Sequence, residues 1–197
     1  MKPEFWRMPA PDSAALAQLA QKTAVLAERL QAVAERFPNA VFASSLAAED
    51  AIITDQIAAL KLPLRVITLN TGKLNPETEA LIGETRRRYP ELAFDVYEPL
   101  AEDAAEFERE YGAAAMYESV ELRKRCCHIR KIEPLNRALA DASAWLTGQR
   151  RSQSVTRSEL NLEETDGARG IAKFNPIFDW EDDDVWAYVQ THRVPMN

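Results

Sequence analysis

The fold class is indicated by residues 40–50, AVFASSLAAED, where a short apolar run passes into a polar turn and then into acidic residues. The run AVFAS is typical of a buried strand, and residues from about Glu49 to Leu60 read as a helix. The alternation continues with expected strands at 64–70, 93–99 and 143–148, and expected helices at 76–89, 101–112, 118–140 and 181–192. This order predicts an α/β fold with a mostly parallel sheet and helices on both faces. The residues between Gly148 and Glu181 are polar, and we expect them to be irregular.

The residues before this region predict a leader and one amphipathic helix. Pro3, Pro9 and Pro11 indicate an irregular leader, and Asp12 with Ser13 forms a helix cap. A stripe at three- and four-residue steps follows: Leu16, Leu19, Thr23, Leu26, Leu30, Val33 and Phe37. We interpret the stripe as a core or subunit contact, which leaves a homo-oligomer open. The predicted organisation is therefore a leader and helix over 1–39 and one α/β domain over 40–197.

Composition excludes several classes of protein. The 197 residues are 46% hydrophobic and 28% charged, as in ordinary globular domains, and the net charge of −7 argues against nucleic acid as a partner. No apolar run approaches the ~20 residues that span a bilayer. The first residues lack the apolar stretch of a secretory signal, so we expect a cytoplasmic protein without a membrane partner. Between Arg123 and Arg157, nine Lys or Arg stand against two acids, which suggests either a compact anionic ligand or a solvated basic helix face.

Ligands of open α/β sheets bind beyond the carboxyl ends of the strands, so the segments after each predicted strand are candidates. Ser44 and Ser45 follow the first strand, where hydroxyls and amide groups at a helix N-terminus can bind an anion. The loop is not a Walker A sequence, and the chain has no GxGxxG motif. The alternative is that both serines only cap the helix.

Two further loops carry polar residues. Asn70, Thr71 and Gly72 follow the second strand and could bond a sugar or a base edge, although such residues also serve ordinary turns. Gly148 follows the fourth strand and precedes three arginines: Arg150, Arg151 and Arg157. Guanidinium groups bind phosphate and sulfate oxygens in pairs of hydrogen bonds, so these arginines form a plausible clamp. The alternative is a loop with solvated arginines.

The two cysteines of the chain, Cys126 and Cys127, are adjacent. Neighbouring Cα atoms lie ~3.8 Å apart, below the usual ~4.4–6.8 Å of disulfides, so two free thiols in a reducing compartment are expected. Adjacent thiolates can hold two corners of an iron–sulfur cluster, and the nearby charges of Arg125, Arg130 and Lys131 favour thiolates. The alternative is two half-buried free cysteines. Zinc is disfavoured because only His128 is close in sequence.

Five segments together resemble a known family: SSLAAED (44–50), LNTGKLNPET (69–78), CCHIRKIEPLNRAL (126–139), TGQRRSQSVTRSEL (147–160) and KFNPIFDW (173–180). In this order and at these intervals they resemble the assimilatory reductases of adenylyl sulfate (APS) and phosphoadenylyl sulfate (PAPS). The resemblance covers about Ala40 to Asn197 and implies an adenine-nucleotide alpha-hydrolase-like fold, related to the PP-loop ATP pyrophosphatases.

The resemblance also implies roles for individual residues. The serine loop and the arginine segment would bind the phosphosulfate, and the turn at Asn70–Gly72, where many members have Asp in place of Asn70, would bind the nucleoside. Cys126 and Cys127 would ligate a [4Fe–4S] cluster, with Lys131 between cluster and substrate. The implied substrate-binding set is Ser44, Ser45, Asn70, Thr71, Gly72, Gly148, Arg150, Arg151 and Arg157.

The implied reaction reduces APS to sulfite and AMP through a cysteine thiosulfonate, with thioredoxin or glutaredoxin as the electron donor. The family's nucleophilic cysteine and its second cysteine pair are expected beyond Asn197. We therefore expect residues 1–197 to be inactive, as part of a longer protein or as a short homologue. The alternatives are a PAPS reductase, which generally lacks the cysteine pair, an ATP pyrophosphatase-like nucleotide transferase, disfavoured without an SGGKDS loop, and a non-catalytic nucleotide-binding module.

Overall fold

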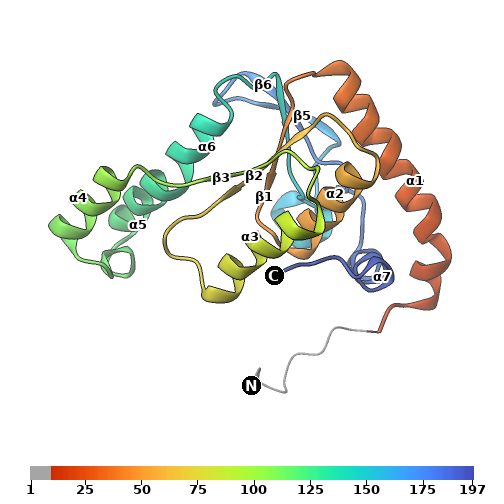
Figure 1. Cartoon of the computed structure of the whole chain (residues 1–197), viewed down its shortest axis with the longest axis horizontal. Helices are drawn as coiled ribbons and strands as arrows, with labels where there is room; N and C mark the ends of the chain where they lie inside the picture. The colour runs from red at the N-terminus through yellow and green to blue at the C-terminus, as the bar shows by residue number, and fades with distance from the viewer. Residues whose placement is uncertain (1–9) are drawn as a thin grey trace.

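A six-stranded sheet forms the centre of the computed structural model, which describes residues 10–197 (Figure 1). Its strands, in the spatial order β3-β2-β1-β4-β6-β5, are β1 Val41–Ser44, β2 Arg65–Leu69, β3 Phe94–Tyr97, β4 Ala144–Leu146, β5 Glu163–Asp166 and β6 Ile171–Phe174. All neighbouring pairs are parallel except β5 and β6. The predicted mostly parallel α/β fold is confirmed.

The expectation of an irregular segment after Gly148 was wrong. Residues 163–166 and 171–174 form β5 and β6, which extend the sheet beyond β4. Their sequences, EETD and IAKF, are short and mostly polar or half-exposed, and only Phe174 is buried among their residues. Such strands carry little of the apolar signal from which buried strands are predicted.

Helices cover both faces of the sheet, as the connection rules require. The crossovers from β1 to β2 and from β2 to β3 run in one direction, and the return to β4 runs in the other, so their helices lie on opposite faces. The main core lies under one group: α1 Ser13–Arg36, α2 Ala48–Ala59, α3 Pro76–Arg88 and α7 Asp182–His192. The segment that begins at α6 Glu133–Ala138 packs on the other face, against Val41 and Ile67.

The N-terminal helix belongs to the same core as the rest of the chain. The Asp12 carboxylate accepts hydrogen bonds from the amides of Ala14 and Ala15, which confirms the expected cap. Leu26 and Leu30 are fully buried in the main core, whereas Leu16 is 44% exposed and lies outside the buried stripe. The residues on either side of the predicted boundary at 39 and 40 therefore share one core, and α1 does not pack as a separate unit. Most of the predicted leader falls on residues 1–9, outside the described residues.

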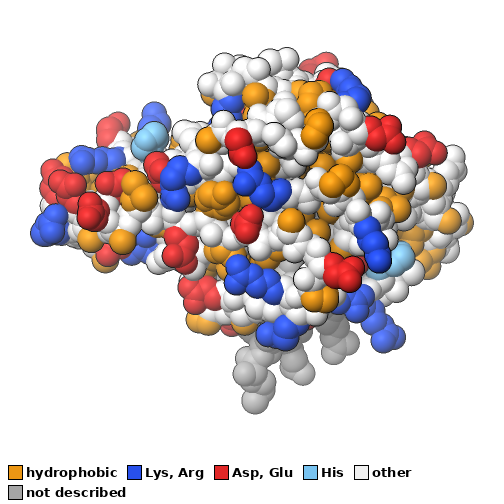
Figure 2. Space-filling view, turned by 45° about the horizontal axis from the view of Figure 1, so that its top comes forward, with side chains coloured by type: hydrophobic (Ala, Val, Ile, Leu, Met, Phe, Trp, Pro, Cys, Tyr) orange, Lys and Arg blue, Asp and Glu red, His pale blue; other side chains and the backbone are white. Residues whose placement is uncertain are grey.

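The chain segment that connects β3 to β4 forms a lobe that projects from the sheet (Figure 1). It contains α4 Ala101–Tyr111, η1 Ala115–Tyr117 and α5 Val120–Cys127, and its surface carries interspersed acidic and basic side chains (Figure 2). The single helix expected over 118–140 widens into a π-helical turn, η2 His128–Ile132, before α6. Pro134 has no amide hydrogen, so the Arg130 carbonyl group cannot receive the ordinary α-helical bond at this point. Within residues 10–197, the helices are all too short or too polar to cross a bilayer.

Candidate functional site

Two cavities lie side by side at the carboxyl end of β1, and both are lined by Ala43 and Ser45. One has a volume of about 320 Å³ and lies between β1 and β4, where the strand order reverses. The other has a volume of about 260 Å³ and lies between β1 and β2. Ligands of open α/β sheets bind at such a reversal, so this position agrees with the sequence-based expectation.

A larger cavity, of about 650 Å³, lies at the opposite end of the sheet. Its lining runs from the end of α2 to the residues just before β2 and β3, and includes Lys61, Arg65 and Tyr89. None of the predicted site residues lines it. We place the site at the carboxyl ends of the strands because the predicted polar residues converge there and amide groups are available there.

The serine loop is shaped by its own side chains. Ser44 is buried, and its Oγ accepts a 3.2 Å hydrogen bond from the amide of Leu46, which has a positive φ of 65°. Ser45 is exposed and lines both cavities. The N-cap of α2 is Ala47, which makes no side-chain cap bond, so neither serine caps the helix in the ordinary way. The start of α2 thus retains the arrangement in which amide groups can bind an anion.

Asp50 fastens this loop, a role that sequence reasoning missed although the residue lies within the SSLAAED segment. Its Oδ2 accepts from the amide of Ser45 at 2.6 Å and from the Ser45 hydroxyl at 2.5 Å. Oδ1 of this carboxylate packs against the backbone of Gly148, whose amide acts to lower the pKa of Asp50. Burial raises the pKa of Asp50 to about 6, because desolvation outweighs the hydrogen bonds from Ser45.

The turn after β2 brings together the residues predicted there. Asn70 Oδ1 accepts from the amide of Gly72 at 3.1 Å, and Asn70 Nδ2 donates to Glu98 at 3.1 Å. Gly72 has a φ of +68°, which glycine adopts without strain. Thr71 is buried and lines the cavity between β1 and β2, together with Thr78 and Lys131.

Arg130 holds this turn in place, which sequence reasoning also missed. Its guanidinium group is buried, and Nη1 donates to the Thr71 carbonyl oxygen at 2.8 Å. Its Nη2 donates to Glu108 at 2.7 Å. Its sequence signal is its position four residues beyond Cys126, which indicates only a charge near the thiols.

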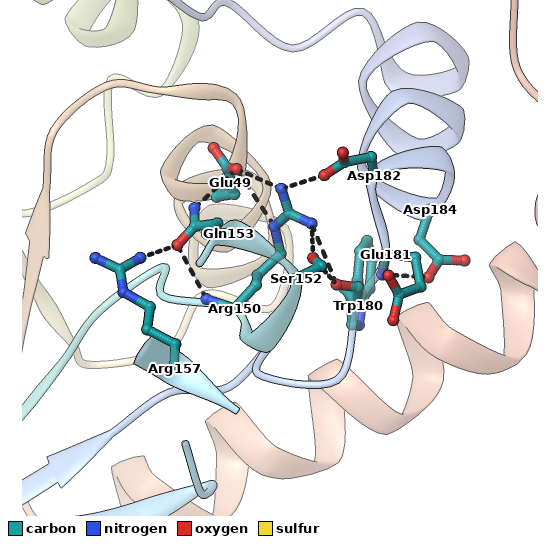
Figure 3. Close-up of polar contacts among 9 residues, drawn as sticks. All are labelled: Glu49, Arg150, Ser152, Gln153, Arg157, Trp180, Glu181, Asp182 and Asp184. Carbon is teal, nitrogen blue, oxygen red and sulfur yellow. Dashed lines mark hydrogen bonds and ion pairs between the residues drawn. The ribbon is translucent and has the colours of Figure 1, made fainter. Parts of the chain in front are cut away.

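Arg150 is buried and all five of its N–H donors are engaged (Figure 3). Nε and Nη2 donate to Glu49, and Nη2 also donates to Asp182 at 2.8 Å. Nη1 donates to Ser152 at 2.7 Å and to the Trp180 carbonyl oxygen at 3.2 Å. Its role as a direct substrate ligand stays a prediction, and requires at least one of these bonds to break.

Glu49 lies at the centre of the same group of contacts. Burial favours its neutral form, but the hydrogen bonds from Arg150 and Gln153 outweigh this, and its pKa is lowered. Arg157 donates to the Gln153 side chain and lines the cavity between β1 and β4 (Figure 3). The exposed Arg151 donates to the Leu160 carbonyl oxygen and stacks on Phe178.

The basic region between Arg123 and Arg157 is not a continuous free patch. Several of its arginines pair with acids, most of them from outside the region: Arg125 with Glu110, Arg130 with Glu108, Arg137 with Glu133, and Arg150 with Glu49 and Asp182. Five other basic residues of this described region have no acidic partner: Arg123, Lys124, Lys131, Arg151 and Arg157. Of these, Arg157 lines the cavity between β1 and β4, and Lys131 lines the cavity between β1 and β2. Two of these unpaired cationic groups are therefore placed where an anion in the cavities could meet them.

Cys126 and Cys127 are both free thiols at the end of α5. Cys126 is buried beside Phe107 and Ala115, and Cys127 is partly exposed. Across residues 10–197, no group of three or more His, Cys, Asp or Glu side chains is arranged to hold a metal ion. The described donors alone therefore do not fit a four-ligand cluster.

Comparison with known sequences decides the family. The sequence model of the phosphoadenosine phosphosulfate reductase domain matches residues 39–197. The chain belongs to this reductase family. The family match begins next to the predicted boundary at residue 40, after α1.

Relatives in the family include proteins named adenosine 5′-phosphosulfate reductase. One, from Neisseria meningitidis serogroup A, is 49% identical over 196 residues, which are 100% of this chain and 80% of the relative. Another, from Burkholderia cepacia, is 51% identical over 91% of this chain and 72% of the relative.

Solved structures agree with the assignment to the reductase family. The phosphate complex of a phosphoadenylyl-sulfate reductase from Candida auris has a TM-score of 0.75 and 26% identity, over 97% of this chain and 92% of that one. An NH3-dependent NAD synthetase from Campylobacter jejuni has a TM-score of 0.62 and 14% identity, over 89% and 74%, and shows the fold alone. The expected fold class is confirmed.

Proposed function

We propose that this chain is the nucleotide-binding part of an APS reductase, which reduces APS to sulfite and AMP in sulfate assimilation. APS is the same compound as adenosine 5′-phosphosulfate. The observation that carries the proposal is the 49–51% identity to proteins named for this activity over nearly the whole chain. The cavities at the carboxyl end of β1 support it, because they combine an apolar compartment with a polar one.

The two cavities suit the two ends of APS. The cavity between β1 and β2, lined by Leu69, Leu74 and Leu135 beside Thr71, would receive the nucleoside. The cavity between β1 and β4 would receive the phosphosulfate, with the start of α2 and Arg157 as its contacts. A contact from the Ser45 hydroxyl would require its hydrogen bond to Asp50 to break. Lys131, on the rim of the first cavity, would approach the same anion from the side of the cysteine helix.

The proposed chemistry is nucleophilic. A cysteine thiolate attacks the sulfur atom of APS, the bond between sulfur and the phosphate oxygen breaks, and AMP leaves with the electron pair. A thiol of thioredoxin or glutaredoxin then attacks the enzyme sulfur, which releases sulfite and forms a mixed disulfide. Cationic groups at the site stabilise charge on the sulfonyl oxygens. Cys126 and Cys127 are the only cysteines among the 197 residues, and neither lines the two cavities.

We also propose that Cys126 and Cys127 are two of the ligands of a [4Fe–4S] cluster. Their free thiols, their adjacency and the basic residues around them support this role. Two further cysteines are needed, and the 197 residues do not contain them. A cytoplasmic location fits the free thiols and the thioredoxin-type donor, and a homo-oligomer stays open.

Binding of APS to the purified chain tests the proposed function. Isothermal titration calorimetry should show tighter binding of APS than of PAPS, because nothing in the described site is reserved for a 3′-phosphate. ATP is the control ligand for a nucleotide transferase. Tighter binding of PAPS would favour the other branch of the family, to which the Candida auris structure belongs, and tighter binding of ATP would contradict a reductase.

A further inference from the structure

The two loops that flank the phosphosulfate cavity meet at one buried carboxylate. Asp50, in the first turn of α2, is 7% exposed. It accepts hydrogen bonds from the amide and the hydroxyl of Ser45, after β1, and its Oδ1 packs against the backbone of Gly148, after β4. Both loops line the same cavity, on either side of the reversal in strand order.

We infer that Asp50 is a positioning residue for the proposed reaction: its carboxylate holds Ser45 and Gly148 together and so sets the width of the phosphosulfate cavity. The inference rests on the proposed function for the identity of the ligand. It assigns Asp50 no contact with the reacting atoms. Ser45 donates both its amide hydrogen and its hydroxyl hydrogen to Asp50, so a hydroxyl contact with the phosphosulfate requires the hydroxyl to turn away while the amide stays bound.

Gly148 shows how closely the two loops approach. A Cβ atom at this position would lie 2.1 Å from Asp50 Oδ1, 3.1 Å from Asp50 Cγ and 3.2 Å from Glu49 Cβ. The backbone at Gly148 does not have a positive φ, so close approach rather than backbone conformation requires glycine here. An alanine would have to displace the carboxylate that joins the loops.

The energetics separate positioning from simple stabilisation. An ionised carboxylate in a buried position is costly, and its pKa is raised accordingly. Glu49 on the same helix adds repulsion and is itself bound by Arg150 from the loop after β4. Arg157 lines the same cavity and Lys131 the adjoining one. A neutral side chain at this position would serve stability as well. Holding Ser45 at Oδ2 and Gly148 at Oδ1 requires a side chain in which both terminal atoms are acceptors.

The first experiment measures the link itself and does not depend on APS. In a pH titration followed by amide nuclear magnetic resonance, the Ser45 and Gly148 signals should shift together, with a midpoint near pH 6. Asp50→Asn should abolish the shared transition, and Asp103→Asn, an exposed residue of α4, should leave it unchanged. Amides that do not respond to Asp50→Asn would overturn the inference.

The second experiment measures the consequence for binding. At neutral pH, Asp50→Asn should keep the stability of the parent but weaken APS binding roughly tenfold or more, because an amide cannot accept on both sides. Asp50→Ala should bind more weakly still. Parallel losses of affinity and of thermal stability in both variants would indicate a structural role only, and unchanged affinity would also overturn the inference.

A double-mutant cycle tests the close approach at Gly148. Gly148→Ala should weaken APS binding in the parent but add little in the Asp50→Ala background, where the obstructing carboxylate is gone. Gly167→Ala is the matched control, since nothing lies within 4 Å of its Cβ position. Additive losses would contradict the inference. If the parent does not bind APS, the proposed function fails, while the amide titration still decides whether Asp50 joins the two loops.

Discussion

The guanidinium group of Arg130 donates a 2.8 Å hydrogen bond to the carbonyl oxygen of Thr71, which joins the helix of the cysteine pair to the turn after β2. The contact spans 59 residues of sequence and is buried. A Cβ atom added at Gly72 would lie 3.1 Å from Arg130 Nη1, so the turn packs directly on the arginine side chain. The proposed nucleoside site and the proposed cluster ligands are therefore parts of one connected arrangement.

Replacing Arg130 with Lys should weaken binding of APS and AMP by about 1.5–3 kcal/mol, because lysine cannot bond both Thr71 and Glu108 in the same geometry. Calorimetry measures the loss, and Arg87→Lys on the exposed face of α3 is the control. Nucleotide affinity equal to that of the parent would show that the turn keeps its shape without this contact.

Arg150 and Arg157 should respond differently to replacement by alanine. Arg150→Ala leaves the largely buried Glu49 carboxylate without its main partner, and should lower the free energy of unfolding by about 3 kcal/mol. Its bond to Asp182 adds little, because that carboxylate is mostly exposed. Urea-induced unfolding provides the measurement.

Arg157→Ala should change the free energy of unfolding by no more than about 0.5 kcal/mol, yet weaken APS binding by about 1.5–3 kcal/mol through loss of a charge-assisted bond. Arg157→Lys should restore only part of the affinity. If Arg157→Ala binds APS like the parent, this arginine is only a solvated surface group.

The contribution of Asp50 to the free energy of unfolding should decrease as pH rises. Its pKa is about 6 in the folded chain and lies near 3.8 without the fold, so between these values the native state holds a proton that the unfolded state has released. Its contribution is therefore most favourable below the lower pKa and is lost as pH rises through the folded pKa, by at most about 3 kcal/mol.

The measurement is the difference in unfolding free energy between the parent and Asp50→Asn, from about pH 4 to about pH 7. The difference should shift in favour of the variant as pH rises. Contributions of opposite sign from acids with lowered pKa values, such as Glu49 and Asp179, cancel in the comparison. A difference that is constant with pH would mean that Asp50 titrates normally.

Residues 1–197 alone should bind APS but release no sulfite when reduced thioredoxin is added, because Cys126 and Cys127 both lie on α5 and outside the two cavities. A colorimetric sulfite assay over many turnovers is the measurement. Sustained sulfite release that is lost in Cys127→Ser would place the nucleophile on α5 and contradict the proposed chemistry.

The sequence by itself determined the fold class and the strands β1 to β4, and it indicated where the candidate site lies. β1 and β2 are apolar because both faces are covered, and a continuous apolar run is visible without any knowledge of partners. Asp12, Pro76 and Gly112 mark helix ends through local backbone chemistry, and local chemistry needs no tertiary structure.

Only the tertiary structure decided which charged groups meet. Arg150 looked like a free anion ligand in the sequence, but Glu49 and Asp182 lie 101 and 32 residues away and satisfy its donors in the folded chain. Asp50 and Arg130 carry no local signal of their roles, because Gly148 and Thr71 become their neighbours only when the loops converge at the sheet edge. The partner of a buried charge is set by positions in space, which cannot be read from the spacing of residues along the sequence.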